Sequence, residues 1–574
     1  MRVKLAKTAG FCWGVERALD IVLETANEAS GPVFTHGPLI HNPPTVKLLE
    51  KKKVYATDPE APAPDTGLVV IRAHGISPQV RERLRASGAA LRDATCPLVA
   101  KVHGIIRKHA RQGAATIIIG EEGHPEVEGH MGYAEAGSYL VTRVEEVERL
   151  PRDLGEVIVV AQTTLNMEEF AHVVDAIRAR YPQAKMFNTI CDATEERQRE
   201  VRALAPKVDL MVVVGGRNSG NTKRLVEVAR EEGAEAVLIE TEEEVDPDFL
   251  RKFKEIGVTA GASTPDWMIR RVVNRIETIP PAENRLLERV VEWLKILSRA
   301  NVLLLLAAAM GAVATAALGG FAPEGRLVAL AALYLFSLHT LNRCASYEAD
   351  RYNEPNRAHF FERHIRALYG AAAAAGLASL ALGASISWIV AAVLAGGMAL
   401  GIFYSARLEP RALHVSRAMD FPASKTLVVA VGWTVTLGVI PALAAPGPVG
   451  PALPVALLFA FSLSLIRSGI VEMRDMQGDR IVGKRTLPIV LGKEPTMTLL
   501  CAVCSALAVL LAASVVNGTL GARIGLAMLA PVAYGGFCLY LFRRKVLGHG
   551  GLTEAALDLK FIIAGLAALL AISV

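Results

Sequence analysis

The chain has 574 residues, which is too long for one ordinary domain, so we expect at least two. Its formal net charge of +5 is small for this length, so we expect no nucleic-acid partner. The seven cysteines include a single CxxC pair, which argues against a disulfide framework or a zinc ribbon. Met1–Gly10 has no continuous apolar core, so we expect no signal peptide and a cytosolic N-terminal half.

Residues 1–280 alternate short apolar runs with amphipathic segments. The runs that read as strands are VKLA, LVVIRAH, ATIIIG, EVIVVAQ, LMVVVGG, EAVLIE and VTAGAS. Strands that alternate with helices are typical of an α/β fold with largely parallel sheets. We therefore expect one α/β domain over residues 1–280.

Three cysteines of this half share one local setting. Cys12, Cys96 and Cys191 each stand in a turn directly before a predicted helix. A helix N-terminus lowers the pKa of a thiol and offers N–H groups to its sulfur. They are either unrelated cysteines or three thiolates that meet at one centre. A structural zinc would need a fourth ligand at short spacing, whereas an iron–sulfur cluster with three protein ligands leaves one iron open to a substrate oxygen.

Polar residues gather in the Gly-rich turns that follow the predicted strands. Neutral hydroxyls, amides and imidazoles at such loop–helix junctions can cradle a diphosphate. The candidates are His41, His74, His124, Glu126, Thr163, Thr164, Ser219, Asn221 and Ser263.

The motifs AGFCWGVERAL, GPLIHNP, RAHG, DATCPLV, GHPEVEG, QTTL, NSGN and TAGAS occur in this order over residues 1–280. This set resembles the 4-hydroxy-3-methylbut-2-enyl diphosphate reductases. The resemblance implies three α/β subdomains around a 4Fe–4S cluster held by Cys12, Cys96 and Cys191. It also implies a diphosphate site formed by His41, His74, Ser219, Asn221 and Ser263, with Thr164 as a further substrate-binding residue. Gly220 departs from the family, which often has Ser at this position.

The same resemblance implies a reaction. His124, Glu126 and Thr163 would lie near the substrate hydroxyl, with Glu126 as the general acid. The products would be isopentenyl and dimethylallyl diphosphate. Because the sequence has no flavin or nicotinamide fingerprint, the electrons would come from an external donor of the ferredoxin or flavodoxin type. An iron–sulfur hydro-lyase is the alternative.

Residues 281–300 are expected to form a linker. Within it, Arg285–Arg299 reads either as an amphipathic helix at a membrane surface or as an ordinary linker helix.

Residues 301–574 carry long apolar runs, most of them close to the ~20 residues of a spanning helix. We expect an all-α polytopic membrane domain of about nine transmembrane helices, at 301–321, 327–342, 367–384, 386–405, 426–445, 450–467, 496–517, 523–542 and 556–574. The even-numbered loops between them hold four or five Arg or Lys each, and the odd-numbered loops at most one. By the positive-inside rule the even loops and the N-terminal half face the cytosol, which predicts a multi-pass protein of the cell inner membrane.

Acidic and amide side chains gather in two of the cytosolic loops. They are Asn342 and Asp350 in the first, and Glu472, Asp475 and Asp479 in the second. Such carboxylates either hold Mg²⁺, which in turn grips a diphosphate, or form local ion pairs with the many arginines nearby.

The motif DMQGDRIVGKRTLP and the nine apolar runs resemble the UbiA superfamily of intramembrane prenyltransferases over about residues 295–574. The resemblance implies transfer of a prenyl group to a lipophilic acceptor. Two acidic positions of the family's first motif are occupied here by Arg343 and Ser346, which should weaken a first metal site. The alternative is therefore a non-catalytic anchor or a diphosphate-binding module.

Overall fold

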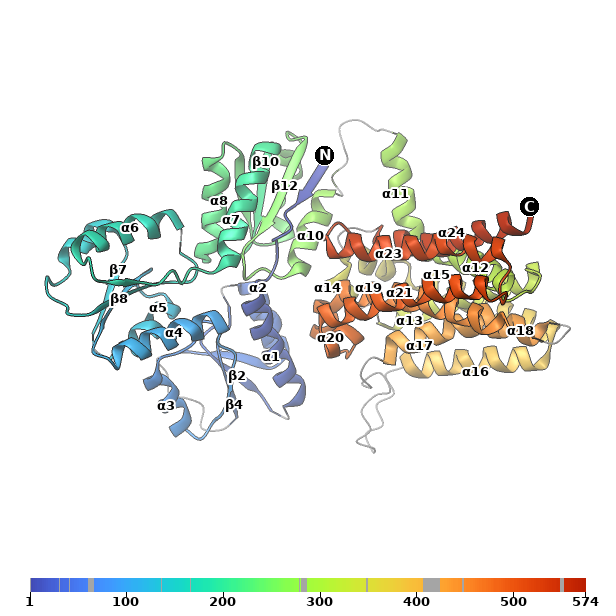
Figure 1. The fold of residues 1–574 in the computed structure, drawn as a ribbon, viewed down its shortest axis with the longest axis horizontal. Coiled ribbons are helices and arrows are strands. Elements are labelled where there is room, and N and C mark those ends of the chain that lie inside the picture. The colour runs from blue at the N-terminus through green and yellow to red at the C-terminus, as the bar shows by residue number, and fades with distance from the viewer. Residues whose placement is uncertain are drawn as a thin grey trace. The chain divides into compact units, whose positions relative to one another are not determined.

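The computed structural model describes residues 2–29, 31–40, 42–59, 67–135, 137–165, 167–277, 279, 286–346, 349–405, 424–445, 449–547 and 552–573. The chain divides into two compact units, Met1–Ala282 and Glu283–Val574. In Figure 1 the first unit runs from blue to green and the second from yellow-green to red.

The described part of the first unit contains three sheets of four strands each, which form its three lobes (Figure 1). All of the strand pairings in these sheets are parallel. The expected fold, three α/β subdomains with parallel sheets, is confirmed. The strands are β1 (Arg2–Leu5), β2 (Val33–His36), β3 (Val54–Thr57), β4 (Leu68–Ile71), β5 (Ala90–Asp93), β6 (Ala115–Ile119), β7 (Ser138–Val141), β8 (Val157–Ala161), β9 (Lys185–Met186), β10 (Leu210–Val214), β11 (Glu235–Ile239) and β12 (Glu255–Ala260).

The three sheets share one connectivity. Their strand orders are β5-β4-β2-β3, β9-β8-β6-β7 and β1-β12-β10-β11. In the last sheet β1 takes the edge place that β5 and β9 take in the other two, although it comes first in the chain. The unit is therefore a threefold repeat whose last sheet borrows its edge strand from the N-terminus.

Three inner strands of these sheets, β6, β8 and β10, are buried along their whole length. Their sequences ATIII, VIVVA and LMVVV are continuous apolar runs rather than alternating ones. Helices cover both faces of a parallel sheet, so both side-chain rows of a central strand must be apolar. The helices are α1 (Trp13–Glu28), α2 (Pro43–Lys51), α3 (Pro78–Ala86), α4 (Pro97–Ala110), α5 (Pro125–Tyr133), α6 (Met167–Arg180), α7 (Asp192–Leu204), α8 (Gly220–Glu231), α9 (Pro247–Leu250) and α10 (Asp266–Glu277).

The described part of the second unit is helical throughout. Its helices are α11 (Leu286–Arg299), α12 (Val302–Leu318), α13 (Gly325–Ser346), α14 (Asp350–Asn353), α15 (Pro355–Ile386), α16 (Trp388–Ser405), α17 (Ser424–Thr434), the π-helix η5 (Val435–Val439), α18 (Ile440–Ala444), α19 (Leu453–Ile481), α20 (Leu487–Leu491), α21 (Lys493–Val516), α22 (Ala522–Ala527), α23 (Leu529–Arg543) and α24 (Thr553–Ser573).

Seven segments of the described chain are long and apolar enough to cross a membrane, and a bent pair formed by α11 and α12 makes an eighth. A shorter apolar helix, Trp388–Phe403, lies within α16. Together these cover the nine apolar segments expected from the sequence. An all-α membrane domain of about this many spans is therefore confirmed.

The segment expected to lie at a membrane surface begins at α11. It meets α12 at an angle of 74°. Asn301 stands at the bend with a left-handed φ of 60°, a conformation that Asn tolerates better than most residues. Its side chain donates to Thr340 Oγ1 at 3.0 Å and accepts from Arg343 at 2.5 Å, which fixes the bend against α13.

The second acidic motif lies on a helix, where a loop was expected. Helix α19 continues through it to Ile481, and Gly483 with φ +80° follows its end. Glycine is the residue that most easily adopts this left-handed conformation after a helix. Gly478 of α19 donates its N–H to Asn353 Oδ1 at 3.1 Å, which holds α14 against α19. This contact brings the two acidic motifs together.

Candidate functional site

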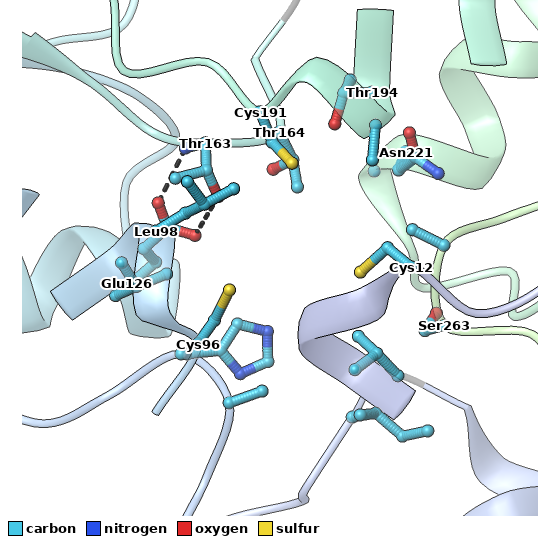
Figure 2. Close-up of a pocket in the computed structure, with 18 of the residues that line it drawn as sticks. Cys12, Cys96, Leu98, Glu126, Thr163, Thr164, Cys191, Thr194, Asn221 and Ser263 are labelled. Carbon is cyan, nitrogen blue, oxygen red and sulfur yellow. Dashed lines mark hydrogen bonds between the residues drawn. The ribbon is translucent and has the colours of Figure 1, made fainter. Parts of the chain in front are cut away.

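A cavity of about 110 Å³ lies where the three lobes of the first unit meet (Figure 2). All of the site residues predicted for this half line it, except His41, which lies outside the described residues. They are Cys12, His74, Cys96, His124, Glu126, Thr163, Thr164, Cys191, Ser219, Asn221 and Ser263. Residues far apart in the sequence thus share one site because each of the three sheets contributes its own set of turns.

Each of the three cysteines is the residue that precedes a helix. Cys12 precedes α1, Cys96 precedes α4 and Cys191 precedes α7, and none of their side chains caps the helix it precedes. Figure 2 shows the three sulfurs pointing into the same space. The predicted setting of these thiols, at helix N-termini, is therefore what the structure shows.

The backbone of each cysteine is fixed by the same kind of contact. The N–H of Cys12 donates to Ala262 at 3.0 Å, that of Cys96 to Ala73 at 2.9 Å and that of Cys191 to Thr163 at 2.8 Å. These acceptors follow β12, β4 and β8. Each of these strands is the sheet neighbour of the strand that leads to the cysteine, namely β1, β5 and β9. The threefold repeat of the fold is therefore what points three thiols at one centre.

The electrostatics of the thiols favour a positively charged partner. Burial raises the pKa of Cys96, the N–H groups of Leu98 and Val99 partly lower it, and the neighbouring Cys12 raises it again. Burial likewise raises the pKa of Cys191, and the sulfurs of Cys12 and Cys96 add to the rise. The ionised thiolates would repel one another, so a metal centre that neutralises their charge favours ionisation.

A single metal ion does not fit this arrangement. Within the described ranges, no three His, Cys, Asp or Glu side chains lie close enough together to hold one ion. One zinc draws its sulfur ligands to about 2.3 Å from a common point. Three cysteine thiols on one cavity are the type of ligand that an iron–sulfur cluster takes.

Glu126 is the central acid of the cavity and is only 2 % exposed. Its carboxylate accepts hydrogen bonds from the Thr163 N–H at 2.7 Å and the Thr163 hydroxyl at 2.8 Å, drawn as dashed lines in Figure 2. His130 Nε2 lies 3.2 Å from Glu126 Oε1, the oxygen that also accepts from the Thr163 N–H. His124 precedes α5, and its Nδ1 accepts from the Glu126 N–H at 3.2 Å.

The pKa of Glu126 follows from these contacts. Burial alone would raise it, but the hydrogen bond and charge of His130, the Thr163 N–H and His124 outweigh burial and lower the pKa to about 2. Glu126 is therefore an anion at neutral pH, held by neighbours that donate to it. A carboxylate in this state can take up a proton before it gives one.

The opposite wall of the cavity offers neutral polar groups. Ser219 precedes α8, and its hydroxyl accepts from the Thr222 N–H at 3.4 Å. Asn221 is only 6 % exposed, and both polar atoms of its amide have no hydrogen-bond partner in the described part of the chain. A buried amide without partners is costly, so this side chain is prepared for a ligand that accepts and donates hydrogen bonds.

Sequence reasoning missed one residue of this site. His130 is fully buried and lies one helical turn after Glu126 on α5. The i, i+4 spacing was visible in the sequence. The pairing itself depends on burial of the helix face, which the sequence alone did not indicate.

A second cavity, of about 120 Å³, lies in the membrane unit. The five predicted residues of this unit, Asn342, Asp350, Glu472, Asp475 and Asp479, all line it. The two acidic motifs therefore face one space, as the expected metal and diphosphate site requires. The side chain of Ser346 lies outside the described part of the chain.

The carboxylates of this second cavity are paired with cations of the chain. Arg357 donates to both oxygens of Asp350 at 3.0 and 2.7 Å. Arg474 donates to both oxygens of Asp475 at 2.7 and 2.9 Å, and Lys484 contacts Asp479 at 3.2 Å. Sequence reasoning named ion pairs only as the alternative to a metal site, and it missed Glu554, which also lines the cavity.

Comparisons with protein families match the two units separately. Residues 3–277 match the family described as LytB protein, and residues 304–557 match the UbiA prenyltransferase family. The first half is 42 % identical to a 4-hydroxy-3-methylbut-2-enyl diphosphate reductase of Opitutus terrae over 291 residues, which are 49 % of this chain and all of that protein. It is 43 % identical to the enzyme of the same name from Aquifex aeolicus, covering 48 % of this chain and 96 % of that protein.

Solved structures resemble each half as well. One is the reductase from Plasmodium falciparum, with 31 % identity and a TM-score of 0.46, covering 50 % of this chain and 98 % of that one. Another is a UbiA homolog from Archaeoglobus fulgidus bound to DMAPP and Mg²⁺, with 17 % identity and a TM-score of 0.37, covering 49 % of this chain and 99 % of that one.

Proposed function

We propose a two-part function for this chain, which belongs to the LytB family of 4-hydroxy-3-methylbut-2-enyl diphosphate reductases. A UbiA prenyltransferase family domain follows the LytB domain in the sequence. The N-terminal half reduces 4-hydroxy-3-methylbut-2-enyl diphosphate to isopentenyl and dimethylallyl diphosphate. The observation that carries this proposal is the meeting of three helix-terminal thiols, a buried carboxylate and an unpartnered amide in one cavity.

Cys12, Cys96 and Cys191 would hold a 4Fe–4S cluster. Their convergence on one cavity and the N–H groups beside the sulfurs of Cys96 and Cys191 fit such a group. When bound, the cluster supplies the two electrons of the reaction and an open iron that polarises the substrate oxygen. The electrons reach it from an external donor of the ferredoxin or flavodoxin type.

Gly14 tests whether the space beside the thiols must stay clear. A Cβ at this position would lie 2.4 Å from the Cys96 sulfur. We therefore expect Gly14→Ala to displace that sulfur and to lower iron and sulfide content after anaerobic purification. Gly104→Ala, on α4, meets no atom within 4 Å and should keep the iron content of the unmodified protein. Equal iron in both variants would contradict the placement of the cluster.

Different residues of the cavity bind the two ends of the substrate. Neutral groups around Asn221 hold the diphosphate, which points the hydroxyl end of the substrate toward Thr163 and Glu126. Since Glu126 is ionised, it first accepts a proton through the Thr163 hydroxyl as the substrate binds. It then returns this proton to the leaving oxygen. Two further protons come from solvent: one completes the water that departs and one reaches carbon, so two electrons and two protons are consumed for each product.

Asn221→Ala tests the diphosphate role. It removes an amide that has no partner within the described protein, so we expect little loss of stability. The KM for the substrate should rise by ~10-fold, the effect of one or two hydrogen bonds to a charged ligand. Steady-state kinetics with a dithionite-type reductant measure this. An unchanged KM would remove Asn221 from the diphosphate site.

The overall reaction has a direct test. Anaerobically purified protein with a strong reductant should form both C5 diphosphates from the hydroxylated one, with two electrons used per product. Turnover without consumption of reductant would overturn the reductase proposal in favour of a hydro-lyase.

The membrane half, on this proposal, binds a prenyl diphosphate and transfers the prenyl group to a lipophilic acceptor. The convergence of both acidic motifs on one cavity supports this reading. The pairing of those carboxylates with arginines favours a second candidate, a module that binds a diphosphate without transfer. Incubation of purified protein with a labelled prenyl diphosphate and membrane lipids separates them, because only a transferase forms a lipid-linked label.

The location follows from the spans and the loop charges. We place the protein in the cell inner membrane with the reductase half in the cytosol. The angle of 74° between α11 and α12 supports a position of α11 along the membrane surface.

A further inference from the structure

The cavity of the membrane unit is built around Glu554, which projects from the first turn of α24. Its carboxylate pairs with Arg343 and Arg357, and it accepts from Arg474 at 3.0 Å. A fourth guanidinium, that of Arg467, lies 3.9 Å away. All of these groups are buried or nearly so. Glu554 thus contacts guanidinium groups from three other helices. Three of these guanidinium groups are also paired with an aspartate, namely Asp350, Asp475 or Asp558.

A divalent cation finds few oxygens in this cavity. It needs carboxylate oxygens that are not already engaged. Asp350 and Asp475 each receive a two-pronged arginine. Asp479 contacts Lys484 through Oδ1, and its Oδ2 alone has no partner among the described residues. Glu472 accepts from the Leu487 N–H at 3.3 Å and from the Thr426 hydroxyl. Among the described residues of this unit, no three acidic or imidazole groups are arranged to hold one ion.

An anion finds a better match. The planar fork of a guanidinium fits phosphate oxygens with two parallel hydrogen bonds, and buried charge-assisted bonds of this kind are strong. Arg343 and Arg357 line the cavity directly, and Lys425 lines it as a further cation. Arg343 also stands where the resemblance to prenyltransferases predicts a carboxylate. A fixed cation of the chain therefore occupies a place where a metal ligand was expected.

We propose that this cavity binds the diphosphate of a prenyl diphosphate directly through Arg343 and Arg357, with Glu554 as the internal counter-ion that the diphosphate displaces, so that binding requires no divalent cation. This inference rests on the proposed function of the membrane half and names how its ligand is held. A site of this kind differs from a prenyl diphosphate site in which Mg²⁺ links the carboxylates to the ligand.

The test measures binding of geranylgeranyl diphosphate to the full chain in detergent, once with EDTA and once with Mg²⁺. We expect the two Kd values to agree within ~3-fold. A Kd that is measurable only with Mg²⁺ would overturn the inference and leave the proposed function intact. Absence of binding in both buffers would overturn both.

Arg343→Asp sharpens the test because it replaces the cation by a metal ligand. In EDTA the Kd should weaken by about 10- to 100-fold, the loss of a pair of charge-assisted hydrogen bonds, and Mg²⁺ should recover most of it. The matched control is Arg326→Asp, the same change at an exposed site on the same helix, α13, which should leave the Kd unchanged. Both variants keep the N-terminal half unchanged, so any ligand that binds there contributes equally to the two measurements. Equal Kd values for both would contradict the inference.

Glu554→Gln provides a measurement that does not depend on the folding of the first variant. It removes the counter-ion and leaves the guanidinium groups in place, so the Kd in EDTA should tighten several-fold. A weaker or unchanged Kd would show that Glu554 does not compete with the ligand and would overturn its assigned role.

Discussion

Replacement of Cys96 by alanine is expected to abolish reductase turnover and to strip the N-terminal half of most of its iron. Three thiols from three lobes point into one cavity, and no fourth cysteine lines it in the part of the chain that the structure describes. Without Cys96 the cluster would lose one of its three protein ligands and would be held more weakly. Loss of a residue that merely supports a metal ligand costs ~10- to 100-fold, so loss of a ligand should exceed this.

Iron and sulfide analysis after anaerobic purification measures the first effect, and turnover with a strong reductant measures the second. Cys501→Ala is the matched control, since Cys501 is an exposed cysteine of α21 in the membrane unit. It should keep both iron and activity. A Cys96→Ala variant with full iron content and normal turnover would remove this thiol, and with it the proposed cluster, from the account.

The sequence predicted the central strands of the first unit and missed several short ones. Strands such as β6, β8 and β10 are continuous apolar runs of five residues, which stand out in any window. The missed strands have four residues or fewer, and β9 has two. A segment this short carries no periodicity. It becomes a strand because a parallel neighbour already offers a row of hydrogen-bonding groups.

The N-terminal site was predictable because its residues sit in turns whose chemistry is local. A cysteine or serine before a helix can be recognised from a few residues around it. The threefold repeat that brings those turns together was not visible, because β1 completes a sheet whose other strands lie more than 200 residues later in the chain. His130 escaped notice for a related reason, since only burial turns its spacing from Glu126 into a contact.

In the membrane unit the fold was predictable from the sequence, whereas the arrangement of the cavity was not. Hydropathy predicted its spans well, because every spanning helix must be apolar over most of its length. The cavity depended on pairs such as Arg343 with Glu554, which are 211 residues apart. In the sequence Arg343 reads as the loss of a metal ligand. In the structure it forms an ion pair with a carboxylate that no motif marks.

Glu126→Gln is expected to lower kcat by ~10²- to 10⁴-fold, which is the usual cost of removing a group that transfers a proton in the rate-determining step. The two oxygens of Glu126 accept from the Thr163 N–H, the Thr163 hydroxyl and His130. A glutamine keeps one of these oxygens and replaces the other by a donor that faces a donor. It fills the same volume but can neither take the proton of the substrate hydroxyl nor return it to the leaving oxygen.

The matched control is Glu128→Gln, an exposed position two residues further along α5. It should change kcat by less than about twofold, because a surface charge contributes little to a buried reaction centre. The KM of the Glu126→Gln variant should stay close to that of the unmodified protein, because neutral groups around Asn221 hold the diphosphate. A rise in KM with an unchanged kcat would assign Glu126 to binding instead of proton transfer.

The pH dependence distinguishes a proton carrier from a structural anion. In the protein without substrate the pKa of Glu126 is lowered from its ordinary value of 4.5 to about 2, so the group stays ionised throughout the neutral range. Because Glu126 is already ionised, its titration does not lower kcat/KM on the acid side at pH values well above 2. The deficit in kcat of Glu126→Gln should therefore be the same at pH 6 and pH 8. A deficit that shrinks steadily as the pH falls across this range would mean that Glu126 is protonated before the substrate arrives. The substrate hydroxyl would then not be the source of the proton that Glu126 returns.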